Sequence, residues 1–467
     1  MSFLIVLASL CFLMWIAYRG HSVILFAPVA ALGAVLLTDP ALVAPMFTGL
    51  FMDKMVGFLK LYFPVFVLGA IFGKLIELSG FSKAIVAATI RLFGADRAML
   101  SIVAVCALLT YGGVSLFVVV FAVYPFAAEL FRQSNIPKRL IPGTIALGAF
   151  TFTMDALPGT PQIQNIIPST FFGTNSWAAP VLGCAGAVFI LIVGLIYLDW
   201  RRRAAAAAGE GYGDAASLLN EPAAFAGSTL ANPLVALLPL VLVGVSNKLF
   251  TALIPGVYGA KHEFVPAAMG AAAPVVQEVS KVAAIWAVEG ALLVGIACVL
   301  LTAWKPVMAS FAEGSKSAIG GALLASMNTA SEYGFGAVIA ALPGFVVVAN
   351  ALAAIPNPLI NEAVTITALA GITGSASGGM SIALAAMSET FVANAQAAAI
   401  PMEVLHRIAA MASGGMDTLP HNGAVITLLA VTGLSHRQAY KDIFAITLIK
   451  TAAVFVVIGV FYATGWV

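Results

Sequence analysis

Long apolar segments, separated by short polar or charged stretches, make up most of this chain. They lie at about 3–18, 22–41, 61–80, 98–130, 140–172, 178–199, 233–254, 281–304, 318–342, 358–393, 403–432 and 443–466. A helix needs about 20 apolar residues to cross the hydrocarbon core of a bilayer. The pattern therefore predicts an all-α polytopic membrane protein with room for roughly ten spans.

Four of these segments are too long or too interrupted to be one simple span. Segments 98–130 and 358–393 carry Gly and Ser clusters near their middle, and we interpret them as re-entrant hairpins. Segments 140–172 and 403–432 carry Pro and Gly clusters instead, which predict broken transmembrane helices. Irregular backbone at membrane depth is tolerated only where it is buried in protein or lines a wet cavity. We therefore expect the four interruptions to lie inside the protein.

Composition supports this fold class and excludes others. Hydrophobic residues make up 61% of the 467 residues and charged residues only 9%, against roughly 25% charged in an ordinary soluble protein. So few charges cannot cover a soluble surface of this size, which excludes a soluble enzyme, a nucleic-acid-binding protein and a disordered chain. The four cysteines lie in apolar runs without a CxxC spacing, so we expect neither a disulfide framework nor a metal site.

The distribution of basic residues predicts the topology. Lys and Arg residues flank segment 98–130 on both sides, which places both ends of this hairpin in the cytoplasm. No Lys or Arg occurs from residue 317 to residue 406, so hairpin 358–393 should open to the outside. Residues 201–232 are polar, rich in Ala and Gly, and open with three arginines; we interpret them as a flexible cytoplasmic linker.

The two halves that this linker joins, residues 1–200 and 233–467, share a set of motifs in the same order. Each motif in the second half follows its counterpart by 262 to 266 residues. The pairs are Phe72-Gly73 with Phe335-Gly336, Gly80-Phe81 with Gly344-Phe345, Gly112-Gly113 with Gly378-Gly379, Ile136-Pro137 with Ile400-Pro401, and Met154–Pro158 with Met416–Pro420. Five ordered matches indicate a duplication. Duplicated halves of opposite orientation are typical of secondary transporters.

The predicted hairpin tips are the first candidate site. Glycine lets the backbone approach a ligand closely, and the N–H groups at a helix N-terminus attract an anion. Two tips meeting at mid-bilayer would form a pocket for a small carboxylate. Close helix packing by small residues is the alternative explanation for these motifs. The candidate substrate-binding residues here are Gly112, Gly113, Ser115, Ser377, Gly378, Gly379 and Ser381.

The two breaks supply the polar candidates. For the substrate these are Thr160, Gln162, His421 and Asn422. Asp155 and Asp417 are the candidates for the coupling ion or proton, because an ionisable group at membrane depth is costly and is retained for a function. His421 could carry a proton or bind the substrate. The alternative for each Asp is that it only caps the half-helix that follows.

Glu332 lies inside the apolar segment 318–342 and is a third candidate for coupling. It could instead neutralise a buried partner such as Lys74 or Lys281. For Lys450, we expect a structural role or a side chain that reaches the membrane interface.

Several of these stretches resemble a known family. The sequence FGKLIELSGF, a hairpin with a Gly/Ser tip and then PGTPQIQN are similar in order to the ion transporter superfamily. Within it, NTASEYGFGAVIAALPGF and SGGMSIALAAMSETF resemble the gluconate:proton symporter (GntP) family, in particular its hydroxy-acid permeases such as 3-hydroxybutyrate permeases. The resemblance implies a scaffold domain, a transport domain with both hairpins, a homodimer, elevator-type alternating access and a place in the bacterial inner membrane.

Departures from the family narrow the expected substrate. Gluconate-transporting members have an acidic residue near the first tip and a His/Pro-rich first break, whereas this chain has YGGVSLF and MDALPGTPQ. We therefore expect import of a smaller organic anion, a hydroxy-monocarboxylate such as 3-hydroxybutyrate. The Ser-Asn-Thr motif of sodium-coupled relatives is missing at the tips, which favours protons as the coupling ion, and no cofactor is expected.

The sequence is compatible with other functions. A sodium-coupled carboxylate symporter of the same fold is the strongest alternative, followed by a gluconate or sugar-acid permease. An anion channel would use the same architecture. An intramembrane aspartyl protease would use Asp155 and Asp417 as a proton-sharing pair, but no GxGD, HExxH or GxSxG motif occurs.

Overall fold

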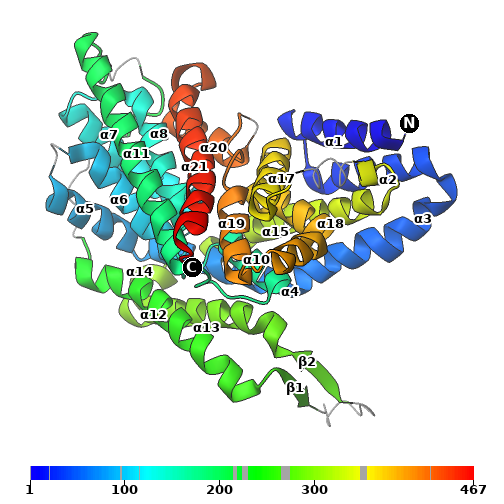
Figure 1. Cartoon of the computed structure of the whole chain (residues 1–467). Coiled ribbons are helices and arrows are strands. Elements are labelled where there is room, and N and C mark those ends of the chain that lie inside the picture. Colours follow the sequence, from blue (N-terminus) through cyan, green and yellow to red (C-terminus); the bar gives the residue numbers. More distant parts are fainter. Residues whose placement is uncertain are drawn as a thin grey trace.

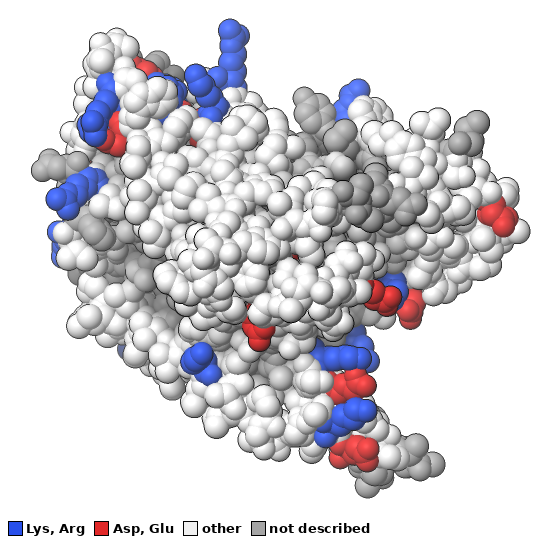
Figure 2. All heavy atoms as spheres, in the orientation of Figure 1, with Lys and Arg blue, Asp and Glu red and all other residues white. Residues whose placement is uncertain are grey.

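The computed structural model is almost entirely helical where it describes the chain (Figure 1). It describes residues 2–19, 21–94, 97–114, 116–213, 218–222, 230–264, 274–347, 355–420 and 422–467. Within them, five helical stretches are long and apolar enough to cross a membrane: Pro40–Leu78, Pro180–Ala207, Pro233–Tyr258, Val279–Thr302 and His436–Thr464. Figure 2 shows a broad uncharged face across the middle of the molecule, with most charged side chains near its edges. Both observations fit a polytopic membrane protein.

The first half begins with two apolar helices and a long interrupted one. These are α1 (Ser2–Tyr18), α2 (Val23–Thr38), and the stretch of η1 (Pro40–Leu42), α3 (Val43–Met46), η2 (Phe47–Phe51) and α4 (Met52–Leu78). After α5 (Phe81–Phe93) come the first hairpin, α6 (Ala98–Tyr111) and α7 (Leu116–Gln133), and the first broken helix, with η4 (Lys138–Leu140), α8 (Ile141–Ala149), α9 (Phe152–Asp155) and α10 (Ile163–Phe172). Helix α11 (Pro180–Ala207) ends the half.

The second half repeats this order. It has α12 (Pro233–Tyr258), α13 (Val279–Thr302), α14 (Trp304–Met308) and α15 (Phe311–Ala341), then the second hairpin, α17 (Pro358–Thr373) and α18 (Ala376–Ala397), and the second broken helix, α19 (Met402–Ser413) and α20 (Gly423–Thr432), before α21 (His436–Thr464). Two short antiparallel strands, β1 (Lys261–Phe264) and β2 (Val275–Glu278), lie between α12 and α13. They are the one feature described here that the all-α prediction did not contain.

Equivalent helices of the two halves run in opposite directions. Gly334 of α15 packs against Phe51, just before α4 begins, whereas Gly314, near the start of α15, packs against Leu78 at the end of α4. The pair α11 and α21 behaves in the same way, because the Val181 N–H donates to the Val467 carbonyl at one end and Arg201 bonds Asp442 at the other. The two repeats are therefore inverted, as the charge pattern predicts.

The linker begins later than predicted and part of it is anchored. Residues 201–207 belong to α11, because an Ala-rich sequence continues the helix. In the described part that follows, Glu221 accepts from Lys138 Nζ at 2.7 Å, and the Asn220 side chain donates to the Ala430 carbonyl of α20 at 2.7 Å. Tyr124 of α7 donates to the Asn220 carbonyl at 2.8 Å. This part of the segment therefore connects the first hairpin to the second broken helix instead of forming a free tether.

Candidate functional site

The two broken helices meet inside the protein. We call residues 150–162 break 1 and residues 414–422 break 2. Asp155 Oδ2 lies so close to Gly414 that a Cβ added to Gly414 would be 1.8 Å from it. Arg407 of α19 donates from Nη1 to the backbone carbonyl of Asp155 at 3.0 Å. The interruptions from opposite ends of the sequence therefore form one buried polar region.

Break 1 holds the tip of the first hairpin. Gln162, the last residue before α10, donates from Nε2 to the Thr110 carbonyl at 2.8 Å and to the Val114 carbonyl at 3.4 Å. Tyr111 donates its hydroxyl to the Pro158 carbonyl at 2.9 Å. Thr110 lies in the last turn of α6, which ends at Tyr111, and its carbonyl also accepts from the Gly113 N–H at 3.0 Å. Gln162 thus donates hydrogen bonds to backbone carbonyls on both sides of the turn at this tip.

Break 2 holds the second tip by an equivalent contact. Asn422, the last residue before α20, donates from Nδ2 to the Gly374 carbonyl at 2.8 Å. Its Oδ1 accepts from the Val425 N–H at 2.9 Å and caps α20. Gln162 and Asn422, both predicted to bind substrate, therefore occupy equivalent places and each joins a break to a hairpin tip.

The turn of the second hairpin lies earlier than the Gly-Gly match predicts. Helix α17 ends at Thr373, and the turn is formed by Gly374, with φ of 65°, and Ser375. The predicted tip residues 377–381 instead occupy the first turns of α18. The register prediction was wrong because Gly-Ser performs in the second hairpin the turn that Gly112-Gly113 performs in the first.

The Gly-Gly pair of α18 has a packing role. A Cβ on Gly379 would lie 2.2 Å from the backbone N and Cα atoms of Ala370 on α17. A Cβ on Gly378 would lie 1.6 Å from Glu332 Oε2. The alternative of close packing by small residues therefore accounts for this pair, although Gly378 also brings backbone next to a buried acid.

The remaining predicted substrate residues fall into three groups. In the first hairpin, a Cβ on Gly112 would contact Leu240, and Gly113 has a φ of 93° that favours glycine. Thr160 and Ser381 are fully buried, and their hydroxyl oxygens have no hydrogen-bond partner within the described chain. Ser115 and His421 lie outside the described residues.

A hollow of about 590 Å³ lies between the first tip and α12. Its lining is almost entirely apolar and includes Tyr111, Gly112, Trp177 and Leu240. Lys248 is the charged residue of this lining, and its ammonium lies 4.6 Å from the centre of the Trp177 ring.

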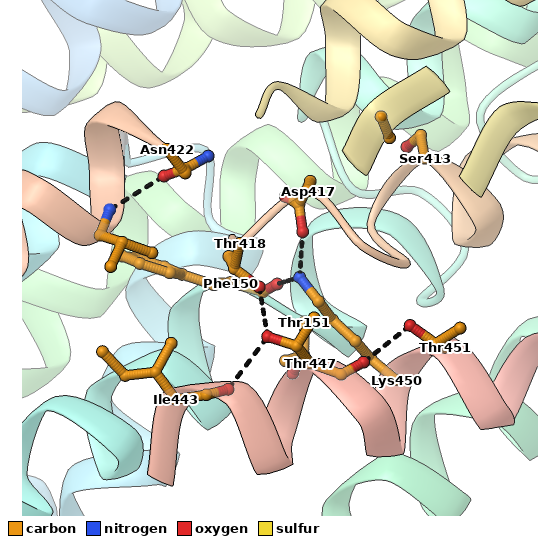
Figure 3. Close-up of polar contacts among 12 residues, drawn as sticks. Phe150, Thr151, Ser413, Asp417, Thr418, Asn422, Ile443, Thr447, Lys450 and Thr451 are labelled. Atoms are coloured by element: carbon orange, nitrogen blue, oxygen red, sulfur yellow. Dashed lines mark hydrogen bonds and ion pairs between the residues drawn. The ribbon is translucent and has the colours of Figure 1, made fainter. Parts of the chain in front are cut away.

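Asp417 forms a buried ion pair that the sequence did not reveal. Lys450 Nζ of α21 lies 2.5 Å from Asp417 Oδ1 and 3.0 Å from the Phe150 carbonyl of break 1 (Figure 3). The Lys450 side chain is 2% exposed, so the prediction that it is structural or reaches the membrane interface was wrong in its interfacial part. Thr418 Oγ1 lies 2.6 Å from Thr447 Oγ1 in the same region.

Neither aspartate caps the following half-helix. The N-cap of α10 is Gln162 and that of α20 is Asn422. Asp155 is buried, and its Oδ2 atom has no hydrogen-bond partner among the residues that the structure describes. The capping alternative is therefore wrong for both residues, which leaves an ion-paired acid in break 2 and an unpaired acid oxygen in break 1.

Among the described residues, none acts as a counter-ion of Glu332. Lys74 pairs with Glu77 at 2.9 Å and Lys281 pairs with Glu278 at 2.5 Å, so neither lysine neutralises it. Glu332 is buried at the interface of α15 and α18, and its Oε2 atom has no partner within the described ranges. One turn earlier, Thr329 Oγ1 lies 3.2 Å from Ser377 Oγ.

Sequence reasoning missed a second buried cation. The Arg407 guanidinium is fully buried and donates to the carbonyls of Ala178 and Asp155 and to Asn165 Oδ1. His406 Nε2 lies 3.4 Å from the same Asn165 oxygen. The His-Arg pair inside the otherwise apolar stretch 404–412 was the available signal. A buried acid, Glu362 on α17, was also missed.

The site contains no evident metal centre. Within the described ranges, no group of three or more His, Cys, Asp or Glu side chains could hold a metal ion. The chemistry that the residues offer is hydrogen bonding, ion pairing and proton binding.

Comparisons with known proteins agree with this architecture. No protein-family model matches the chain. Over 475 residues, the chain is 59% identical to a Bacillus subtilis (strain 168) protein described as the uncharacterized transporter YxjC, and the alignment covers all of both chains. The crystal structure of the Alcanivorax borkumensis YdaH transporter, described as having an unusual topology, is similar with a TM-score of 0.50 and 14% identity, over 92% of this chain and 90% of that one. The structural likeness shows the fold, and the sequence identity shows that this chain is a membrane transporter of the same family as YxjC.

Proposed function

We propose that this transporter imports a small organic anion, a hydroxy-monocarboxylate such as 3-hydroxybutyrate, together with protons by alternating access. The observation that carries the proposal is the meeting of two inverted breaks, where Asp155 touches Gly414 and Lys450 joins Asp417 to Phe150. A region formed by both repeats can open toward either side of the membrane when one part of the fold moves against the other.

The anionic substrate is supported by the backbone of the site. Helices α10, α18 and α20 all begin in this region, and helix N-termini present N–H groups and a positive dipole end. Of the predicted substrate residues, Thr160 and Gln162 precede α10, Asn422 precedes α20, and Ser377, Gly378 and Gly379 lie in the first turn of α18. The departures from gluconate-transporting relatives favour a small acid with few hydroxyl groups.

Proton coupling is supported by the buried acids. Asp155 and Glu332 each have a carboxylate oxygen without a partner in the described structure, and Asp417 has a single cationic one. An unpaired carboxylate in the membrane interior is costly as an anion, so binding a proton relieves that cost. These three acids are our candidates for carrying the coupling proton.

Uptake by purified protein in proteoliposomes tests the proposal. We expect an inward proton gradient to drive accumulation of 3-hydroxybutyrate, and replacement of sodium by choline to leave it unchanged. Loss of uptake in choline would select the sodium-coupled alternative, and preferential uptake of gluconate would select the sugar-acid alternative. No uptake of any hydroxy acid of three to six carbons would contradict the proposal.

The family resemblance adds a homodimer, elevator-type movement and the bacterial inner membrane to this proposal. Mass measurement of the detergent-solubilised protein tests the dimer. Crosslinking between cysteines placed on α15 and α18, which meet where Thr329 contacts Ser377, tests the movement, because elevator transport requires such pairs to separate between states while pairs inside the α4–α15 contact stay together.

A further inference from the structure

Lys450 lies in the middle of α21, in an apolar part of a helix that is long enough to cross the membrane. Its ammonium donates to one carboxylate, that of Asp417, and to the Phe150 carbonyl (Figure 3). Taking a lysine out of water is costly, and a cation in this setting is retained when it has a function. The proposed function requires a group that receives the negative charge of the substrate.

We infer that Lys450 binds the carboxylate of the transported anion, and that Asp417 occupies this place when the substrate is absent. The inference rests on the proposed function and specifies its substrate-binding charge. Exchange of one carboxylate for another preserves the charge-assisted hydrogen bond to Lys450 Nζ, so the desolvated ammonium never loses its counter-ion.

The two partners of this ion pair differ in how freely they can move. Lys450 belongs to α21, whose helical hydrogen bonds continue on both sides of it, and Phe150 is a second acceptor for its ammonium. Asp417 belongs to break 2, where residues 414–420 and Asn422 are not helical. A local rotation in break 2 can therefore remove the carboxylate of Asp417 and leave the ammonium in position.

Arg407 does not offer the same exchange. All the contacts of its guanidinium described above are to groups that cannot leave, namely the carbonyls of Ala178 and Asp155 and the Asn165 amide oxygen. It holds break 1 to the start of α11. Of the two buried cations, Lys450 is the one bound to a replaceable carboxylate.

The exchange links anion binding to proton binding. Once displaced, Asp417 is a carboxylate at membrane depth without its counter-ion, and a proton from the aqueous side neutralises it. The titratable groups around Asp417 are Lys450 and Tyr440 from α21 and Asp155 from break 1, with Arg407 beyond Asp155. The substrate charge and the proton charge cancel, so one anion and one proton would move together without net charge.

The test compares four proteins in proteoliposomes: wild type, Lys450→Met, Asp417→Asn and the double variant. We measure the apparent affinity for 3-hydroxybutyrate, exchange of internal for external substrate, proton-driven accumulation and thermal stability in detergent. Lys450→Met should weaken substrate binding by about 10- to 100-fold, the loss of a hydrogen bond to a charged group. Asp417→Asn should retain exchange and lose proton-driven accumulation.

The double variant separates recognition from structure. It contains no unpaired buried charge at this position, so its thermal stability should recover relative to Lys450→Met, while its apparent affinity for 3-hydroxybutyrate should stay as weak as that of Lys450→Met. Double variants at the exposed pair of Lys281 and Glu278, also 2.5 Å apart, serve as the matched control and should transport normally.

Each outcome gives a decision. Wild-type apparent affinity for 3-hydroxybutyrate in Lys450→Met, or in the double variant, while wild type is active would overturn the assignment of Lys450 and leave the proposed function standing. A wild-type protein that moves no hydroxy acid would overturn the proposed function and this inference with it.

Discussion

The two breaks are equivalent in backbone and different in charge. In both, an amide side chain just before the second half-helix holds the adjacent hairpin tip: Gln162 in break 1 and Asn422 in break 2. In both, an aspartate precedes a Leu-Pro pair. Asp417, however, is paired with Lys450 of α21, whereas Asp155 faces Gly414 with an unpartnered oxygen in the described structure.

The helix equivalent to α21 explains the difference. Helix α11 carries no charged residue from Pro180 to Leu198, so it cannot supply a counterpart of Lys450 to break 1. Duplication has preserved the groups that hold the tips, and the charged groups have diverged. The comparison teaches that symmetry builds the shape of this site and places an acid in each break, while the lysine that pairs with one of these acids lacks a symmetric partner.

The largest expected effect on stability concerns Arg407, which lies in the second half of the chain and holds break 1 of the first half. Arg407→Met leaves the carbonyls of Ala178 and Asp155 and the Asn165 amide oxygen without this donor. We expect a loss of stability of about 3 kcal/mol or more, measured as thermal unfolding in detergent. Arg203→Met is the control, because Arg203 is 75% exposed and its pair with Asp199 should contribute less than about 1 kcal/mol. Equal effects would show that Arg407 has no special role.

The same substitution in the two breaks should have different effects. Asp417→Asn removes the counter-ion of Lys450 and should destabilise the protein by about 2 kcal/mol. The cost is limited to this size because the amide oxygen still accepts the hydrogen bond from Lys450. Asp155→Asn replaces a buried carboxyl group that has no ion-pair partner in the described structure, and it should change stability by less than about 1 kcal/mol in either direction. The measurement is thermal unfolding of both variants at one pH. Two equal shifts would remove the distinction between the breaks.

The amide clamps should show a smaller difference. Asn422→Ala removes both the bond to Gly374 and the cap of α20, and we expect a cost of about 1–3 kcal/mol. Gln162→Ala removes only the bonds to the first tip, with an expected cost of about 1 kcal/mol. Hydrogen exchange at residues 108–114 and 370–376 should locate each loss at its own tip. Loosening of both tips by either variant would contradict independent clamps.

The smallest effect on stability should come from the linker. It contacts α20 and therefore holds the second broken helix. A hydrogen bond from Arg139 lowers the pKa of Glu210 below its ordinary value. A lowered pKa in the folded state gives stability that is present above the unfolded pKa, about 4.3, and is lost as the pH falls through the folded value. We expect hydrogen-exchange protection of residues 208–213 to fall below about pH 4.

Glu210→Gln is the matched variant for this measurement. It should reduce the protection of residues 208–213 already at neutral pH and remove most of its dependence on acid. A pH dependence that is unchanged in Glu210→Gln would show that another group holds this part of the linker.

Much of the fold could be predicted because its signals are local. The Gly cluster at residues 112–113 and the closely spaced prolines at 158 and 161 weaken the helix at their own positions, so hairpin 98–130 and the first break were expected close to where the structure has them. The register of the second tip was not predictable in this way. Gly374-Ser375 and Gly378-Gly379 look alike in sequence, and only the packing of α18 on α17 and α15 separates a turn from a contact.

The sequence by itself determined that this chain crosses the membrane, that its halves are inverted repeats, and that each half contains a hairpin and a broken helix with an acid at the break. Apolar run length, the positions of Lys and Arg, and Gly and Pro act over a few residues or through simple spacing. The tertiary structure alone decided which acid has a counter-ion and which cation is held by backbone. Lys450 meets Asp417, and Arg407 meets Asp155, because helix rotation and packing bring residues from distant segments together in a buried region.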